Sequence, residues 1–393
     1  MRILHTSDWH IGRTFHGHST DAHLSEVLAA LADAVREHGV DAVVVAGDVF
    51  DSSTPKAEAF TMLNAAVRAI RDAGATVILT SGNHDGPARL GHMAEFAAFG
   101  GVHVMADLAR LATPVTLEDA HGEVHLYGIP YVHPEFLRAA YEDFDGTTHG
   151  DALAFAMGLI RDDAAARGGR FIVASHCFAG RAGEAPGETT ELSGRAEERD
   201  ISRGGLNLVD LSVFDGPDYV ALGHIHSHQT LSERVRYSGA PLRFSFGEIS
   251  SDKIAWLVDL DASGLAAVER LALPTPRRAV RLEGTLEELL SPDAHADATE
   301  AWVEAILTDD QLPRDAMRAL QGRFPYAVTL THRPAHRADH GDAGYAERVE
   351  GRTDLEIVDE FLGFVRNGAA LSADERGLVT DALAALESAE AAR

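Results

Sequence analysis

Short apolar runs that end in polar loops recur through the first half of the chain. The run Val40-Asp41-Ala42-Val43-Val44-Val45 is followed by Gly47 and then by Asp48 and Asp51. A β-branched run that stops at a glycine predicts a buried strand whose carboxyl-end loop carries both carboxylates. Four more strands of this kind, each followed by polar residues, are predicted at residues 2–6, 75–80, 170–175 and 218–223.

Helical periodicity fills the intervals between the first of these strands. One apolar face is formed by Leu24, Val27, Leu28, Leu31 and Val35. Thr54 and Pro55 predict an N-cap and a first helical position, opening a helix that runs to about Asp72. Strands that alternate with helices define an α/β fold, in which ligands gather beyond the carboxyl ends of the strands.

A change of pattern near Pro274 and Pro276 predicts a domain boundary, after strands at 235–237, 254–260 and 266–273. A small α+β domain should follow, with strands at 279–282 and 327–331, a helix at Leu286 to Leu290 and a second helix near 301–307. Residues 332–352 are polar and without a period, which is typical of a linker. We therefore expect a first domain at 1–274, a second at 275–333, a linker at 334–353 and a helical element at 354–393.

The last two predicted helices begin at capping boxes, Thr353 with Glu356 and Ser372 with Glu375. Their apolar stripes consist of Leu355, Val358, Phe361, Leu362 and Val365, and of Leu378, Val379, Leu383 and Leu386. Such stripes fit equally well a hairpin that packs on its own domain and an element that binds a partner. Upstream, residues 178–203 have little periodicity and predict a long loop near the functional site.

The composition of the chain excludes several classes of protein. The 393 residues are 45% apolar, enough for a sizeable core, and the net charge of −27 disfavours a duplex-binding protein with a basic face. Bound cations or a basic partner can still supply positive charge locally. The single cysteine, Cys177, excludes an internal disulfide, and no apolar run is long enough for a membrane span or a signal peptide. We expect a cytoplasmic protein without a membrane segment.

Metal-ligating residue types follow five of the predicted strands: Asp8, His10, Asp48, Asn83, His176, His224 and His226. This mixture of oxygen and nitrogen donors suits Mn²⁺, Fe²⁺ or Zn²⁺. Seven donors are too many for one tetrahedral ion and about right for two ions that share a bridging carboxylate. Two such ions, ~3.5–4 Å apart, can hold the attacking and leaving oxygens of a phosphoryl displacement.

Each motif taken alone has a simpler explanation. A His-x-His pair is more often structural, Asn83-His84-Asp85 can be an ordinary turn, and Cys177 is expected to be a small buried side chain, not a nucleophile. The joint arrangement of the motifs favours the metal centre.

Five blocks together resemble the signature of the calcineurin-like metallophosphoesterases: Asp8-x-His10, Gly47-Asp48-x-x-Asp51, Gly82-Asn83-His84-Asp85, His176 and Gly223-His224-x-His226. The resemblance implies a sandwich of two sheets flanked by helices. It also implies that one ion is held by Asp8, His10, Asp48 and His226, and the other by Asp48, Asn83, His176 and His224. His84 would then face the scissile phosphate, and Asp51 would orient His84.

Several segments, at residues 6–12, 47–51, 218–226, 237–242 and 244–246, resemble bacterial nuclease subunits that work with an ATPase in double-strand break repair. This resemblance implies a nucleoid-associated, Mn²⁺-dependent exonuclease and endonuclease that acts as a homodimer on double-stranded DNA ends and hairpins. The domain at 275–333 would cap the DNA, and the final helices would dock on the ATPase. No Gly-x-x-x-x-Gly-Lys-Ser/Thr pattern occurs, so the ATP site would belong to the partner.

Two other functions remain open from the sequence. The same metal core could serve a small-molecule or cyclic-nucleotide phosphodiesterase, or the chain could be a non-catalytic scaffold for DNA ends. The presence of His84 disfavours the scaffold, because that imidazole is not needed to hold the ions.

Overall fold

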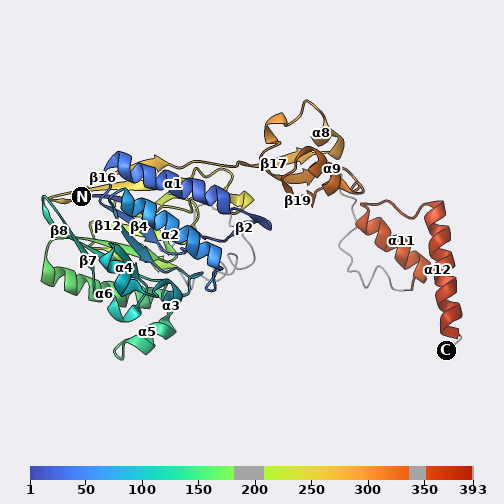
Figure 1. Ribbon diagram of the computed structural model, residues 1–393. Helices are drawn as coiled ribbons and strands as arrows, with labels where there is room; N and C mark the ends of the chain where they lie inside the picture. Colours follow the sequence, from blue (N-terminus) through green and yellow to red (C-terminus); the bar gives the residue numbers. More distant parts are fainter. Residues whose placement is uncertain (181–207, 336–350, 392–393) are drawn as a thin grey trace. The chain divides into compact units, whose positions relative to one another are not determined.

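The computed structural model describes residues 1–180, 208–335 and 351–391. It divides into two compact units, Met1–Arg277 and Arg278–Arg393, and each is described by itself (Figure 1). The loop predicted at 178–203 and the linker predicted at 332–352 lie largely outside the described residues. Within the described ranges, no helix combines the length and apolar character needed to cross a membrane.

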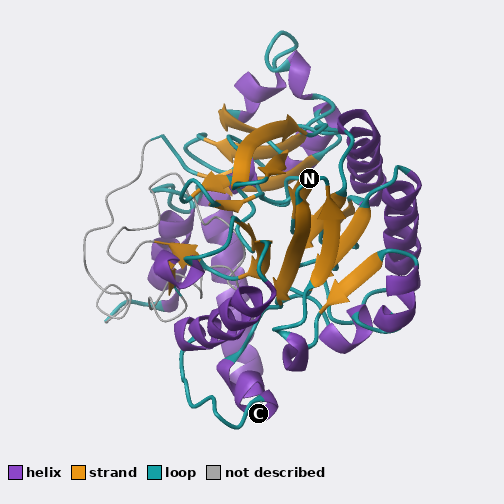
Figure 2. Cartoon of the chain, turned by 90° about the vertical axis from the view of Figure 1, so that its left-hand side faces the viewer, coloured by secondary structure: helices purple, strands orange, loops and turns teal. Residues whose placement is uncertain are grey.

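Two six-stranded sheets form the centre of the first unit (Figure 2). The first sheet has the order β16 (Gly264–Ala272), β15 (Ile254–Asp261), β1 (Arg2–Thr6), β4 (Ala42–Ala46), β5 (Thr76–Thr80) and β6 (Val102–Met105). The second has the order β13 (Gln229–Thr230), β14 (Val235–Tyr237), β12 (Tyr219–Gly223), β9 (Arg170–His176), β8 (Gly122–Ile129) and β7 (Val115–Asp119). The central strands of each sheet run parallel, so their carboxyl ends share one edge.

Three apolar cores separate four layers in the order helix, sheet, sheet, helix. Val43 and Val45 of β4 face α1 (Asp21–His38) and α2 (Ala57–Asp72), while Val44 faces the second sheet and meets residues such as Ile172. This alternation follows from the two-residue period of a strand. The far face of the second sheet packs against α6 (His149–Arg167). The predicted two-sheet sandwich flanked by helices is confirmed.

The remaining elements of the first unit are short and lie in its loops: β2 (Thr14–Phe15), β3 (His18–Ser19), α3 (Pro87–Leu90), α4 (Ala94–Phe99), α5 (Pro134–Ala140), β10 (Ala179–Gly180) and β11 (Val209–Asp210). The predicted face of α1 is buried throughout. The predicted start of α2 was wrong by two residues, because its N-cap is Lys56 and the helix begins at Ala57. Thr54 belongs instead to a turn, where its backbone N–H donates to Ser52 Oγ at 3.2 Å.

The second unit contains a parallel three-stranded sheet with the order β17 (Ala279–Gly284), β18 (Trp302–Leu307) and β19 (Ala327–His332). The helices α8 (Leu286–Leu290) and α9 (Ala316–Arg323) lie in the two crossover connections. The helix predicted near 301–307 was wrong, because this segment is the central strand β18. A central strand is apolar on both faces, so its sequence lacks the alternation that would have distinguished it from a helix.

The chain closes with α11 (Asp354–Val365) and α12 (Ala373–Ala391), which pack against each other. Both predicted capping boxes are present at the starts of these helices. Ion pairs between Asp359 and Arg376 and between Arg366 and Glu375 join the two helices, the second with 3.0 Å between Nη2 and Oε1.

Candidate metal centre

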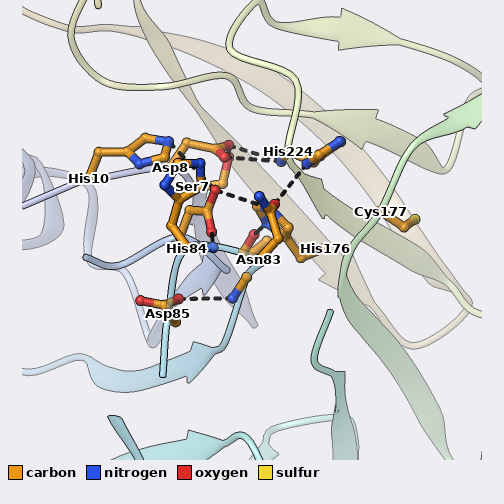
Figure 3. Close-up of polar contacts among 12 residues, drawn as sticks. Ser7, Asp8, His10, Asn83, His84, Asp85, His176, Cys177 and His224 are labelled. Carbon is orange, nitrogen blue, oxygen red and sulfur yellow. Dashed lines mark hydrogen bonds and ion pairs between the residues drawn. The ribbon is translucent and has the colours of Figure 1, made fainter. Parts of the chain in front are cut away.

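The predicted ligands lie at the carboxyl ends of five parallel strands from both sheets. Asp8 and His10 follow β1, Asp48 follows β4 and Asn83 follows β5. In the second sheet, His176 ends β9 directly opposite Gly223 of β12, and this register brings His176 close to His224 and His226. Figure 3 shows side chains from these separate loops pointing toward one another.

The backbone is strained at several of these residues. Asp8, His10, Asp48 and His224 have φ values of 53°, 44°, 49° and 103°, in the left-handed region that residues with a Cβ rarely adopt. Such conformations cost of order 1–3 kcal/mol each and cluster at functional sites. The fold therefore holds these four side chains in place at a cost to its own stability.

One cluster of donor atoms contains Asp8, His10 and His226, whose ligand atoms lie within 4.8 Å of one another. The Nε2 atoms of His10 and His226 are 3.1 Å apart. Ser7 Oγ donates a hydrogen bond to Asp8 Oδ2 and also contacts Ser238 Oγ at 2.8 Å, which fixes the Asp8 carboxylate.

A second cluster is built around Asp48 and Asn83. Asp48 Oδ2 lies 3.3 Å from His176 Nε2 and 3.6 Å from His10 Nε2, so this oxygen stands between the two groups of histidines. Asn83 Oδ1 lies 3.1 Å from both His176 Nε2 and His224 Nδ1. All seven predicted ligands are thus brought together, and Asp48 occupies the shared position.

Two glycines make this close approach possible. A Cβ added at Gly47, which has a φ of 83°, would overlap the His176 ring. A Cβ added at Gly82 would overlap the Asp48 carboxylate. The loops can therefore bring Asp48 and His176 together only because these two positions carry no side chain.

Hydrogen bonds to main-chain carbonyls select the nitrogen that two of the imidazoles present. His176 Nδ1 lies 2.9 Å from the Ala46 carbonyl oxygen, which can only accept, so Nδ1 carries the proton and Nε2 is left for a ligand. His84 Nδ1 is fixed in the same way by the Asp51 carbonyl oxygen at 3.0 Å. Such partners of the outer nitrogen orient the histidines of metal sites.

The electrostatics of the cluster also fit a cation. Burial opposes ionisation of Asp48, but the charge and hydrogen bond of His176, together with the charges of His10 and His84, lower the pKa of Asp48 well below its ordinary value. Burial opposes protonation of His176, yet the Asp48 carboxylate raises the pKa of His176 to about 9. Burial lowers the pKa of His224 to about 3, so this ring is neutral. An ion that binds here replaces the His176 proton as the charge facing Asp48.

His84 and Asp51 lie beside this cluster in an arrangement that differs in part from the prediction. The main-chain carbonyl of Asp51 contacts His84 Nδ1, whereas its carboxylate oxygen Oδ1 is 3.9 Å from that nitrogen. The carboxylate lies closer to His10 Nδ1, at 3.5 Å, and to Arg13, which donates to it at 3.3 Å. Asp51 thus contacts His84 through its backbone and His10 through its side chain.

Asp85 joins two of the loops that carry ligands. Its carboxylate accepts hydrogen bonds from the backbone N–H groups of Gly82 at 2.8 Å, Phe50 at 2.9 Å and Val49 at 3.1 Å. This side chain is buried and points away from the metal cluster (Figure 3). Cys177, the neighbour of His176, is buried, as predicted, and it is turned away from the cluster.

Sequence reasoning missed two charged residues behind His226. Glu248 and Lys253 are both buried, and they form an ion pair. Burial opposes ionisation of Glu248, but the Lys253 ammonium keeps the pKa of Glu248 well below its ordinary value. Their only signal in the sequence was the rarity of lysine, since Lys56 and Lys253 are its two occurrences.

A cavity of about 1430 Å³ opens beside the cluster and reaches Asn83. Its lining includes Tyr131, whose ring stacks on that of His224 with 6.3 Å between the centroids. The metal cluster therefore has an adjoining space large enough for part of a substrate.

Comparison with known proteins agrees with this geometry. Residues 1–228 match the family model of the calcineurin-like phosphoesterases, and residues 276–365 match that of the type 5 capsule protein repressor C-terminal domain. The chain belongs to the calcineurin-like phosphoesterases, a family of metal-dependent hydrolases that use divalent ions.

Close relatives narrow the assignment. The SbcD component of the nuclease SbcCD from Escherichia coli K12 is 30% identical over 92% of this chain and 92% of its own length. The corresponding protein from Rhodobacter capsulatus is 33% identical over 85% of this chain and 81% of its own. Among solved structures, a dimetal phosphatase from Danio rerio covers 70% of this chain and 99% of its own at 12% identity, with a TM-score of only 0.39. On the sequence relatives, the chain belongs to the SbcD family of nuclease subunits.

Proposed function

We propose that this nuclease is a two-metal, Mn²⁺-dependent exonuclease and endonuclease acting on double-stranded DNA ends and hairpins. The observation that carries the proposal is the convergence of seven residues with oxygen and nitrogen donors, Asp48 at their centre and His84 beside them. Carboxylate, amide and imidazole donors without a thiolate suit Mn²⁺. Fe²⁺ and Zn²⁺ are the alternatives among first-row ions.

In this proposal Asp8, His10, Asp48 and His226 hold one ion, and Asp48, Asn83, His176 and His224 hold the other. The bound ions supply Lewis-acid stabilisation of the phosphate and lower the pKa of a water molecule. The protein's part is to fix the donors. The strained backbone at Asp8, His10, Asp48 and His224 and the hydrogen bond from His176 Nδ1 to the Ala46 carbonyl serve this purpose.

His84 is the proposed catalytic residue that acts on the leaving group. In the hydrolysis, a water oxygen forms a bond to phosphorus, the bond from phosphorus to the leaving oxygen breaks, and that oxygen takes up a proton. Because the Nδ1–H group of His84 is held by the Asp51 carbonyl, the doubly protonated ring is the form that can donate from Nε2 to the leaving oxygen, while the attacking water gives up its proton to solvent. The exposed side of His84 is available to a substrate, since the residue is only half-buried.

The deciding experiment compares His84→Gln with the wild-type chain on linear and hairpin DNA in Mn²⁺. We expect the variant to keep both ions and lose about 10²- to 10⁴-fold in turnover, the range typical of general acid catalysis. His92→Gln is the matched control, because His92 is exposed and follows α3 outside the cluster. A His84→Gln variant that cleaves DNA at the wild-type rate would overturn the catalytic assignment.

Substrate class is tested by the same preparation. Cyclic nucleotides and an aryl phosphodiester, assayed beside duplex DNA ends, address the alternative of a small-molecule phosphodiesterase. A non-catalytic scaffold would bind DNA ends without Mn²⁺-dependent cleavage of any of these substrates. We expect kcat/KM to be higher for duplex DNA ends than for cyclic nucleotides or the aryl phosphodiester.

We also infer an assembly with an SbcC-like ATPase, since the relatives are named as subunits of SbcCD. In this inference residues 275–333 cap the DNA, 334–353 link the units, and 354–393 dock on the ATPase. A basic partner would offset the net charge of −27 on this chain. Self-association as a homodimer is supported by exposed apolar side chains on and beside α4, among them Phe96 and Phe99 with 65% and 90% of their surface accessible.

A further inference from the structure

The Glu248 carboxylate has partners at both of its oxygens. Oε1 accepts hydrogen bonds from the Phe244 backbone N–H at 3.1 Å and from Ser245 Oγ at 3.2 Å, and it lies 3.5 Å from His226 Nδ1. Oε2 pairs with the Lys253 ammonium. Only 6% of the surface of Glu248 is accessible. The carboxylate is therefore held rigidly, with one oxygen directed to the outer nitrogen of His226.

Lys253 completes the arrangement from the other side. Its ammonium donates to Glu248 Oε2 and also to the main-chain carbonyl of His226 at 3.0 Å. Only 4% of the surface of Lys253 is accessible. The pair thus contacts both the imidazole and the backbone of His226, so that Nε2 points to His10 Nε2 3.1 Å away.

The burial of both charges needs a reason. A buried ion pair loses much hydration free energy, and apolar residues of similar volume often stabilise a protein at least as well. Orienting a metal-binding histidine offers such a reason, because a carboxylate on the outer nitrogen fixes the tautomer and makes the ring a stronger donor. His176, by comparison, has only the neutral Ala46 carbonyl at its outer nitrogen.

We infer that Glu248, with Lys253 as its counter-ion, is a positioning residue for His226 and sets the affinity of the metal position formed by Asp8, His10 and His226. This inference rests on the proposed two-metal function. It assigns the pair a role at one metal position and none at the position of Asn83, His176 and His224.

The test is a Mn²⁺ titration of the full chain by calorimetry, with electron paramagnetic resonance of the bound ion. Wild type should bind two ions. Glu248→Gln keeps the shape of the side chain but lacks the charge. It should lower the affinity for one of the two ions by about 10- to 100-fold, as loss of the hydrogen-bond partner of a metal-binding histidine does in other proteins. The second ion should keep its affinity, and the resonance spectrum of the singly loaded protein should change.

The double variant Glu248→Gln/Lys253→Met separates positioning from stability. It removes both buried charges, so its thermal midpoint should return toward that of wild type even if Glu248→Gln alone folds poorly. Its metal affinity should stay as low as that of the single variant. Asp119→Asn is the matched control, because it breaks a partly buried ion pair with Arg170 outside the site and should leave both affinities unchanged.

The outcomes distinguish the inference from the function on which it rests. Wild-type protein that binds no Mn²⁺ would overturn the two-metal proposal itself. Wild-type protein that binds two ions, together with a double variant that binds both with unchanged affinity, would overturn only the role of Glu248.

Discussion

His10 Nε2 and His226 Nε2 lie 3.1 Å apart although 216 positions separate the two residues in the chain. One follows β1 in the first sheet and the other follows β12 in the second. Two neutral imidazole nitrogens gain little from such proximity without a cation or a proton between them. An N–H···N hydrogen bond or a shared cation accounts for this approach, and the second agrees with the metal centre proposed above.

Asp48 should be the residue whose loss removes both ions. Its Oδ2 atom stands between His10 and His176, so Asp48→Ala deletes the one donor common to both clusters. We expect metal analysis of the dialysed variant to find less than one tenth of the wild-type Mn²⁺ content, a loss of at least about 1.4 kcal/mol in binding.

Asp72→Ala is a suitable control for this measurement, because Asp72 is exposed at the end of α2. Retention of one full equivalent of Mn²⁺ by Asp48→Ala would show that the two clusters do not share a bridging carboxylate.

Asp85 should act on activity through the loops that it joins. In Asp85→Asn, an amide N–H group must face at least one of the backbone N–H groups of Gly82, Val49 and Phe50, so a buried donor loses its acceptor. We expect denaturant unfolding curves to show that the free energy of unfolding falls by about 2 kcal/mol. Turnover should fall as well, because Asp48 and Asn83 lie on the joined loops.

For comparison, Asp107→Asn changes an exposed carboxylate that caps a short turn by accepting from the Ala109 N–H at 3.0 Å. This variant should change the free energy of unfolding by no more than about 1 kcal/mol. If Asp85→Asn were no more destabilising than Asp107→Asn, the joining role would be wrong.

The sequence was sufficient to predict which loops lie side by side at one edge of the sheets. Each apolar run had one end defined by a glycine or a polar residue, and parallel strands place such ends at one edge of a sheet. The register that sets His176 opposite Gly223 then follows from the fold. The orientation of the imidazoles did not follow, because the Ala46 and Asp51 carbonyl groups that fix them are main-chain atoms, present at every position of any sequence.

Two other features were beyond sequence reasoning for different reasons. Segment 301–307 is buried on both faces, so its pattern does not distinguish a strand from a helix. Glu248 and Lys253 lie in a loop region where charged residues are normally exposed, and only packing reveals that they are buried behind His226. The residues predicted as ligands are thus brought together in the fold, whereas the two residues that contact His226 from behind were not predicted.

Asp119 should make stability depend on acid pH. The hydrogen bonds from the Arg170 guanidinium, together with the N-terminal ammonium, lower the pKa of Asp119 below its ordinary value. A depressed carboxyl pKa stabilises the folded state above the unfolded pKa of about 4, and this contribution is lost as the pH falls further. At pH 7, Asp119→Asn should therefore reduce the free energy of unfolding by about 2 kcal/mol.

The difference between Asp119→Asn and wild type should shrink as the pH falls from about 5 to 2, in a series of denaturant unfolding curves. Asp33→Asn serves as the control, since Asp33 pairs with Arg36 on an exposed helix face and such pairs contribute little. A difference that stays constant with pH would exclude the ionised carboxylate as its cause.

The helix α11 should provide the surface that binds the ATPase. Phe361 and Phe364 are about half exposed on this helix, and both lie within the proposed docking element. Replacing both with Glu places charge where an apolar contact is expected. We predict at least about a tenfold loss of affinity for an SbcC-like ATPase, because buried aromatic side chains dominate such interfaces. The thermal midpoint and the Mn²⁺-dependent cleavage by the isolated chain should stay unchanged.

The same two positions provide their own control. Phe361→Leu/Phe364→Leu keeps the surface apolar, so it should bind the ATPase within a few-fold of wild type when the affinities are compared by calorimetry. Equal binding by the Glu and Leu variants would show that this face of α11 packs elsewhere, and the docking assignment would then have to be given up. Weaker binding by the Glu variant alone, with cleavage intact, would separate the partner-binding surface from the nuclease site, as expected for an element that lies outside the first unit.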